Sequence, residues 1–154
     1  MATGEFLTNC KFYFEADGIT DKVISEIRGL VCSSPVGGAE NVQGSSKNGA
    51  KTRQVTPTVE RFTHVIVKLV ATNDVDLYQW YEKCNKNDAG GSSWRTNRKA
   101  SSITAYGQDG SMQARWEIVN SYPCKYGGPD FGAGQSSMAT ETLELVHEGI
   151  KRVL

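Results

Sequence analysis

The sequence has no excess of charge of either sign. Its 154 residues include 17 lysines and arginines against 17 aspartates and glutamates, so the formal net charge is zero. A chain without a strong positive field has no general attraction for nucleic acid or for an anionic membrane surface. We therefore do not expect charge to draw this protein to either of them.

Long apolar runs are also lacking. No stretch approaches the roughly 20 apolar residues that cross a bilayer, and the opening segment MATGEFLTNC has neither region of a secretory signal. We expect a chain that is made in the cytosol and is not exported by a cleaved signal. At 38% hydrophobic and 22% charged residues the composition is that of a soluble globular protein, and 154 residues predict one domain over 1–154.

Motifs for metal binding are missing. The cysteines Cys10, Cys32, Cys84 and Cys124 are widely separated, form no CxxC pair and have no histidine at a zinc-binding spacing. Reduced, structural cysteines are the expectation, with a disulfide as the alternative. We expect no metal and no cofactor.

Motifs for catalysis are missing as well. There is no GxSxG motif and no acid/base pair at a fixed spacing. His64 and His147 both fall in predicted strands, where a lone histidine is more often a hydrogen-bonded wall residue than a catalyst. The sequence therefore predicts a protein that is not an enzyme.

Two segments could contact phosphate, the first because it nearly matches a phosphate-binding loop and the second because it is a basic cluster beside one aromatic residue. In GSSKNGAKT (44–52) Ala50 separates the second glycine from the lysine, and Pro57 follows where a phosphate-binding loop needs a helix. The cluster WRTNRK (94–99) has three basic residues, which are more often a solvated turn. Neither segment predicts nucleotide binding.

What the sequence does contain is a series of short alternating runs. In TETLELVHEG (140–149) Leu143 and Leu145 alternate with polar residues, which is typical of a strand with one face on a core. Residues 10–18 and 21–30 alternate in the same way and predict a hairpin or a corner between two sheets. The β-branched run at 61–71 predicts a central strand. Further strands are expected at 101–108 and 111–120, joined around Asp109-Gly110, followed by an irregular connection at 121–137.

One segment has helical periodicity instead. Leu77, Trp80, Tyr81 and Cys84 are spaced at i, i+3, i+4 and i+7, which predicts a helix over 74–85. Asn73 or Asp74 can cap its start. About six strands and one helix favour an antiparallel sandwich or partly open barrel, mainly β, with the helix on its flank.

A long segment rich in Gly, Ser and Asn interrupts these elements between Ser33 and Pro57. A loop of this length inside a compact domain is unusual and is generally functional or disordered. We read it as one long loop within the domain.

Charged residues of both signs alternate with the apolar positions of the predicted strands. Such a face suits solubility, and it also suits the wall of a water-filled channel that must not bind its cargo. The residues of this polar sheet face are Lys11, Glu15, Glu26, Arg28, Arg115, Glu117 and Glu144.

The C-terminal half contains the segments MQARWEIVNSYPCKYGGPDF and MATETLELVHEGIKRV, and the first half contains KFYFEADG…ISEIRGL and HVIVKLVATNDVDLYQWY. These segments resemble the tail tube proteins of contractile phages and related contractile injection systems, and the closing motif is the specific part. The matching positions of the C-terminal half are Trp116, Asn120, Tyr122, Pro123, Lys125, Glu141, Leu143, Glu144, Leu145, His147, Glu148 and Gly149. The longer loop at 33–57 and the extended segment at 84–100 favour the extracellular injection particles or a phage close to them.

The resemblance implies a structural subunit without chemistry of its own. It implies two near-orthogonal sheets with a flanking helix, hexameric rings that stack into a tube, and the loop at 33–57 crossing between rings. The implied partners are the protein itself, sheath, baseplate and terminator proteins, and a cargo of DNA or effector protein. The expected place is a phage tail or injection particle assembled in the cytoplasm of the producing cell. The candidate contact residues are Gly38, Glu40, Asn41, Gln43, Lys47, Lys51 and Arg53.

Three alternatives remain open from the sequence. The chain could be the tube component of a type VI secretion system, which shares the architecture. It could be a small β-sandwich binding module that recognises a ligand with its loops at 33–57 and 85–99, or a hydrolase with a dispersed site. Rings or hollow filaments in electron microscopy would support the tube, and a lasting monomer that binds a ligand would support the module.

Overall fold

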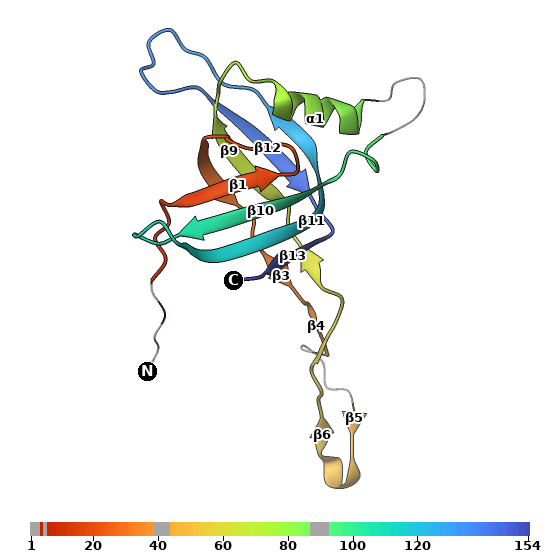
Figure 1. Cartoon of the computed structure of the whole chain (residues 1–154). Helices are drawn as coiled ribbons and strands as arrows, with labels where there is room; N and C mark the ends of the chain where they lie inside the picture. Colours follow the sequence, from red (N-terminus) through yellow and green to blue (C-terminus); the bar gives the residue numbers. More distant parts are fainter. Residues whose placement is uncertain (1–3, 5, 39–43, 87–92) are drawn as a thin grey trace.

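The computed structural model describes residues 4, 6–38, 44–86 and 93–154. Within these residues a body of long strands carries one α-helix, and shorter strands form a projection from it (Figure 1). The strands of the body are β1 (Phe12–Ala16), β2 (Ile24–Arg28), β9 (Val65–Val70), β10 (Lys99–Tyr106), β11 (Met112–Gly127), β12 (Thr140–Val146) and β13 (Gly149–Arg152), and the helix is α1 (Asp76–Asn85).

Strand β11 belongs to two sheets. Its first half pairs antiparallel with β10 and β13 and its second half with β12, which gives the order β1-β10-β11-β12-β9-β2 with β13 beside β11. We call β1, β10, β13 and the first half of β11 the first sheet, and β2, β9, β12 and the second half of β11 the second sheet. Figure 1 shows β1 and β10 running across the direction of β9 and β12. The prediction of a mainly β, antiparallel sandwich with one helix is confirmed.

The core lies between the two sheets and under the helix. On each of β9 and β12 the alternation predicted from the sequence sends every second residue inward, and β9 is an interior strand as expected. The buried residues that form one contiguous core cluster are Phe14, Ala16, Ile19, Val65, Val67, Leu69, Leu77, Trp80, Cys84, Ile103, Ile118, Leu143 and Leu145.

The first two strands do not form a hairpin. Strand β1 pairs with β10 and β2 pairs with β9, so the chain passes from one sheet to the other between them. The connection 17–23 is long enough for this crossing, and both Phe14 and Ile27 reach the shared core. Of the two predictions, the corner between sheets is right and the hairpin is wrong.

Strand β2 departs from simple alternation. Its register with β9 shifts between Ile24 and Glu26, because Ser25 forms a bulge. The bulge brings Ile24 and Ile27 to the same side of the strand, where both pack against the core. A strict period of two had placed these two isoleucines on opposite faces.

Strand β11 continues through the segment expected to be irregular. Residues 121–127 extend the strand and pair with β12, so the expected irregular connection is wrong for these residues. The strand turns from the first sheet into the second at Asn120, whose φ of 49° lies in the left-handed region. Asn120 Nδ2 donates to Glu148 Oε2 at 2.7 Å, and the Glu148 backbone N–H donates to the Val119 carbonyl at 3.0 Å. Arg98 pairs with the same carboxylate, so three segments are joined at this corner.

Helix α1 starts two residues later than predicted. The N-cap position is held by Val75, which has no capping side chain, so the expected cap at Asn73 or Asp74 is wrong. Asp74, one residue earlier, still satisfies a free N–H of the first turn, because its Oδ1 accepts a hydrogen bond from the Asp76 N–H at 2.9 Å. The predicted stripe is buried at Leu77, Trp80 and Cys84. Trp80 Nε1 donates to the Asn97 carbonyl at 2.8 Å, which fixes the helix to the segment before β10. The described residues contain no helix long and apolar enough to cross a membrane.

The expected long loop is a two-stranded arm. We define the arm as the described residues from 32 to 62; Figure 1 shows it leaving the body at the end opposite α1. Its strands pair as β3 (Cys32–Ser33) with β8 (Arg61–Phe62), β4 (Val36–Gly37) with β7 (Thr56–Pro57), and β5 (Gly44–Ser45) with β6 (Lys51–Thr52). The segment expected to be one long loop thus contains, in its described part, three short antiparallel strand pairs that satisfy part of its backbone groups.

Candidate assembly surfaces

The arm presents almost entirely exposed side chains. Lys47, Lys51 and Arg53 are exposed near its tip, and Gly38 adopts a φ of 83° beside β4. Hydrogen bonds at the base keep the two sides together: Ser34 Oγ donates to the Thr58 carbonyl at 2.9 Å. Of the predicted contact residues, Glu40, Asn41 and Gln43 lie outside the described residues.

The arm is anchored to the body by a close backbone approach at Gly29. This glycine has a φ of 90°, and a Cβ built on it would lie 2.1 Å from the His64 carbonyl oxygen. Thr63 Oγ1 donates to the Gly29 carbonyl at 3.1 Å. The two strands that enter and leave the arm therefore touch directly at the edge of the body.

The polar residues predicted for one sheet face divide between two surfaces. Glu15, Arg115 and Glu117 line a hollow on the outer face of the first sheet, floored in part by the buried Ser102. Arg115 Nε lies 3.8 Å from Glu117 Oε1. Lys11 lies just before β1, and its Nζ donates to the Gln108 carbonyl at 3.2 Å.

The remaining predicted residues lie on the outer face of the second sheet. Glu26 and Arg28 form an ion pair on β2, and the hydrogen bond from Arg28 lowers the pKa of the Glu26 carboxyl. Both line a shallow hollow with Lys68 and Thr142. Glu144 lies on the same face of β12, so charges of both signs cover this surface as expected.

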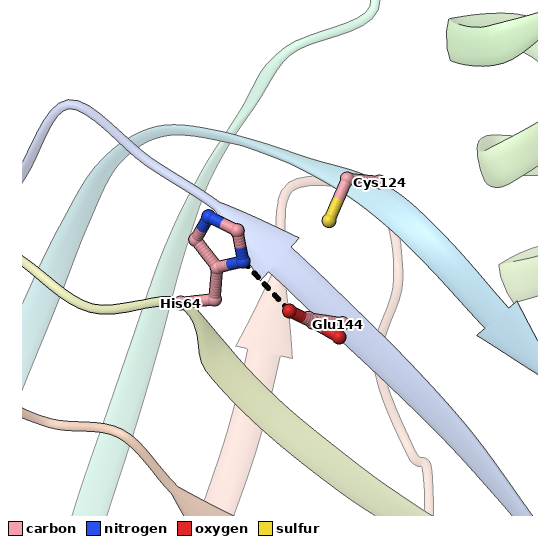
Figure 2. Close-up of side chains that lie close together, drawn as sticks. All are labelled: His64, Cys124 and Glu144. Atoms are coloured by element: carbon pink, nitrogen blue, oxygen red, sulfur yellow. Dashed lines mark hydrogen bonds and ion pairs between the residues drawn. The ribbon is translucent and has the colours of Figure 1, made fainter.

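Glu144 has two neighbours that the sequence did not associate with it. Its Oε1 lies 2.6 Å from His64 Nδ1, and the Cys124 thiol lies beside this pair (Figure 2). These three side chains come from segments that are 20 or more residues apart in the chain. No local spacing signals such a group, because only the pairing of β9, β11 and β12 brings it together.

The sandwich is open between the edges of its two sheets. Strands β1 and β2 end the strand order, and each has one strand partner within the described chain. An apolar groove of about 440 Å³ lies between these edges, and Phe12, Ile27, Leu30 and Trp116 are among its lining residues. The alternation of β11 placed Trp116 on the core side, but the open edge leaves this indole only partly buried.

All four cysteines are free thiols. Cys10 and Cys32 are exposed, Cys84 is buried and Cys124 is half-buried. Burial raises the pKa of the Cys84 thiol, so this group stays protonated at neutral pH and packs as a small apolar side chain.

Comparison with solved structures gives chains of the same fold. The chain superposes on a chain of the sheath/tube terminator structure of PVC, an extracellular contractile injection system, with a TM-score of 0.76 and 15% identity, covering 99% of this chain and 100% of that one. A chain of the anti-feeding prophage baseplate gives a TM-score of 0.73 at 14% identity, covering 99% and 97%. The Hcp1 protein of Flavobacterium johnsoniae gives 0.60 at 15% identity, covering 96% and 95%.

A search of curated proteins finds no match. The family model of the T4-like virus tail tube protein gp19 matches residues 8–151. This range covers α1, the arm and all strands of the body, apart from the last residue of β13. The match confirms the resemblance seen in the C-terminal motif. The chain thus belongs to the T4-like virus tail tube protein family, and its role is that of a structural tube subunit.

Proposed function

We propose that this subunit forms hexameric rings that stack into the inner tube of a contractile tail or injection particle. The observation that carries the proposal is the open sandwich: β1 and β2 each leave one side of the strand unpaired within the described chain. Unpaired strand edges favour pairing with another chain, and a closed ring satisfies every edge at once. Identical neighbours are the partners that make this closure possible.

The arm supports the stacking of rings. It leaves the body at one end of the molecule and is exposed along its length, so it offers a surface for contacts beyond its own ring. We assign the contacts between rings to Gly38, Lys47, Lys51 and Arg53, together with Glu40, Asn41 and Gln43.

The polar faces support the role of a conduit. The two outer faces carry charges of both signs and the chain has zero formal net charge. A strongly basic lumen would hold DNA through phosphate contacts, whereas a mixed wall lets DNA or an effector protein pass. We propose that one of these faces lines the lumen, and that the single domain of residues 1–154 carries no catalytic activity.

Chains that share the fold support the proposed partners. They come from structures of a sheath–tube complex, a baseplate and a tube terminator, and we propose that this chain contacts a sheath and a baseplate of its own particle. We place its assembly in the cytoplasm of the producing cell. The type VI secretion tube is the second candidate, because a type six secretion system protein shares the fold as well.

The arm gives a direct test. Deleting Gly38 to Lys51 leaves the β4–β7 pair joined by residues 52–55, a length that closes a hairpin. Because the described part of the deleted segment contributes nothing to the core, we expect a folded subunit that forms no stacked tubes in electron microscopy.

A matched control separates the length of the arm from its charge. Replacing Lys47 and Lys51, the two basic residues that the deletion removes, with glutamine keeps the length of the arm, and we expect tubes with weaker stacking. Tubes of normal length from the deletion variant would refute the role of the arm. A full-length protein that stays monomeric at high concentration would refute the ring itself.

A further inference from the structure

Three potential metal ligands meet on the outer face of the second sheet. His64 directly precedes β9, Glu144 lies on β12 and Cys124 lies on the second half of β11. One atom from each, an imidazole nitrogen, a carboxylate oxygen and a thiol sulfur, lies within 4.8 Å of the other two. Figure 2 shows these side chains gathered above three neighbouring strands.

The pairing of β9, β11 and β12 brings these three side chains together. Glu144 pairs with Ile66 across to β9, and His64 is two residues before Ile66, so both side chains lie on the outer face. On the other side of β12 the register with β11 shifts between Pro123 and Lys125. Pro123 is buried opposite Leu145, so alternation turns the next residue, Cys124, to the outer face beside Glu144, and the bulge leaves both Cys124 and Lys125 opposite Glu144.

We propose that His64, Cys124 and Glu144 bind a divalent transition-metal ion, with zinc as the best fit, and leave the fourth position open. Imidazole nitrogen, thiolate sulfur and carboxylate oxygen are the three ligand types that zinc takes in proteins. Around a tetrahedral zinc ion such atoms lie roughly 3.3–3.6 Å apart. His64 Nδ1 and Glu144 Oε1 lie 2.6 Å apart, so this pair opens by roughly 0.7 Å to admit the ion.

Ion binding must displace the proton of the Cys124 thiol. Burial raises the pKa of this thiol, and the Glu144 carboxylate raises it further, so the thiol is protonated when the site is free. A divalent ion offsets this cost, because it stabilises the thiolate and the carboxylate together. The thiol proton is released to solvent when the ion binds, so binding weakens as the pH falls.

The geometry separates a metal site from a catalytic triad. In a Cys–His–acid triad one imidazole nitrogen faces the thiol and the other faces the acid. Figure 2 shows the second nitrogen of His64 on the far side of the ring from both Cys124 and Glu144. Among the described residues no hydrogen bond joins His64 to the Cys124 thiol, whereas one ligand atom of each side chain lies within 4.8 Å of the other two, as three ligands of one ion require.

Cobalt(II) titration of the untagged full-length protein, with a phosphine reductant present, tests the site. We expect one ion per subunit, with a thiolate-to-cobalt charge-transfer band and the strong visible bands of a tetrahedral site, both removed by added zinc. Cys124→Ser should abolish the charge-transfer band and weaken binding at least about 100-fold, since loss of even an outer partner costs 10–100-fold. Cys10→Ser, which changes an exposed thiol elsewhere, should leave binding unchanged.

Two further variants keep the test decisive if Cys124→Ser does not fold. Glu144→Gln and His64→Gln replace half-buried and exposed groups, and each should weaken cobalt binding, while Glu26→Gln on the same face should not. The absence of a charge-transfer band in the wild type would overturn the proposal. A charge-transfer band that persists in Cys124→Ser, or that is lost in Cys10→Ser, would overturn the proposal as well. The site lies within one subunit, so this outcome is independent of ring assembly.

Discussion

At the scale of single residues, Gly29 is a position where the backbone admits no side chain. Its φ of 90° is strained for any residue with a Cβ, and that Cβ would lie 2.1 Å from the His64 carbonyl oxygen. We expect Gly29→Ala to lower the free energy of unfolding by about 3 kcal/mol, the sum of backbone strain and overpacking. Urea denaturation measures the loss.

Gly128→Ala is the matched control for Gly29. A Cβ on Gly128 would meet no atom within 4 Å, so we expect a change below about 0.5 kcal/mol. Equal losses at the two glycines would contradict the close approach between the strands that enter and leave the arm.

His147 makes stability depend on pH. Its Nε2 lies 2.9 Å from the Thr63 carbonyl, to which it donates, while Nδ1 is buried with no hydrogen-bond partner among the described residues. Burial lowers the pKa of His147, and the nearby His64 lowers it further. The unfolded chain therefore binds a proton more readily than the folded one.

It follows that the contribution of His147 is fully present above pH 6.5 and is lost as the pH falls through the folded pKa. We expect the free energy of unfolding to fall between pH 7.5 and 5.5, with a slope from this group of at most about 1.4 kcal/mol per pH unit. His147→Gln keeps a donor near Thr63 and removes the titration, so its unfolding should depend less on pH. An unchanged pH profile would exclude this group as the cause.

At the scale of strands, the exposed edges distinguish the free subunit from the tube. Strands β1 and β2 are edges of the described sheet, whereas β9 lies between β12 and β2. We expect hydrogen exchange in the free subunit to be faster at the amides of β1 and β2 that face away from the sheet than at those of β9.

In assembled tubes the same edge amides should become at least about tenfold slower, because each gains an acceptor from a neighbouring subunit. Peptides from β9 provide the internal control, since their amides are already paired in one subunit. Mass spectrometry of exchange in subunits and tubes gives the comparison. Equal exchange at β1 and β2 in both states would show that these edges are not the contacts of the ring.

At the scale of the whole molecule, a single core connects both sheets and the helix. Trp116 packs against this core from the first sheet, and Trp80 is buried in it from α1. Because β11 runs through both sheets, neither can unfold without the other losing a strand. We predict one cooperative urea transition for the monomer, with fluorescence and circular dichroism coinciding.

The Trp116→Phe variant keeps Trp80 and Trp94, whose fluorescence reports on the helix and its surroundings. The urea midpoint from the fluorescence of this variant should match its midpoint from circular dichroism. Two separated transitions would contradict the single domain predicted for residues 1–154. A denaturation series below the concentration at which rings form keeps assembly out of the measurement.

The sequence by itself determined the elements that follow a regular period. Leu143 and Leu145 face the core, and the stripe of Leu77, Trp80 and Cys84 is buried, because residues at a fixed local spacing share a face of a strand or helix. The C-terminal motif likewise pointed to the tail tube family. These features depend on neighbours in the chain, so they can be read without knowing the fold.

Only the tertiary structure decided which segments meet. The bulge at Ser25, the corner at Asn120 and the paired strands of the arm all depend on partners that are distant in the sequence. Alternation showed that Glu15 and Glu144 point away from the core, but not that they lie on different sheets. The cluster around Cys124 was hidden for the same reason: its three ligands become neighbours only when three strands pair, and no spacing along one strand encodes that pairing.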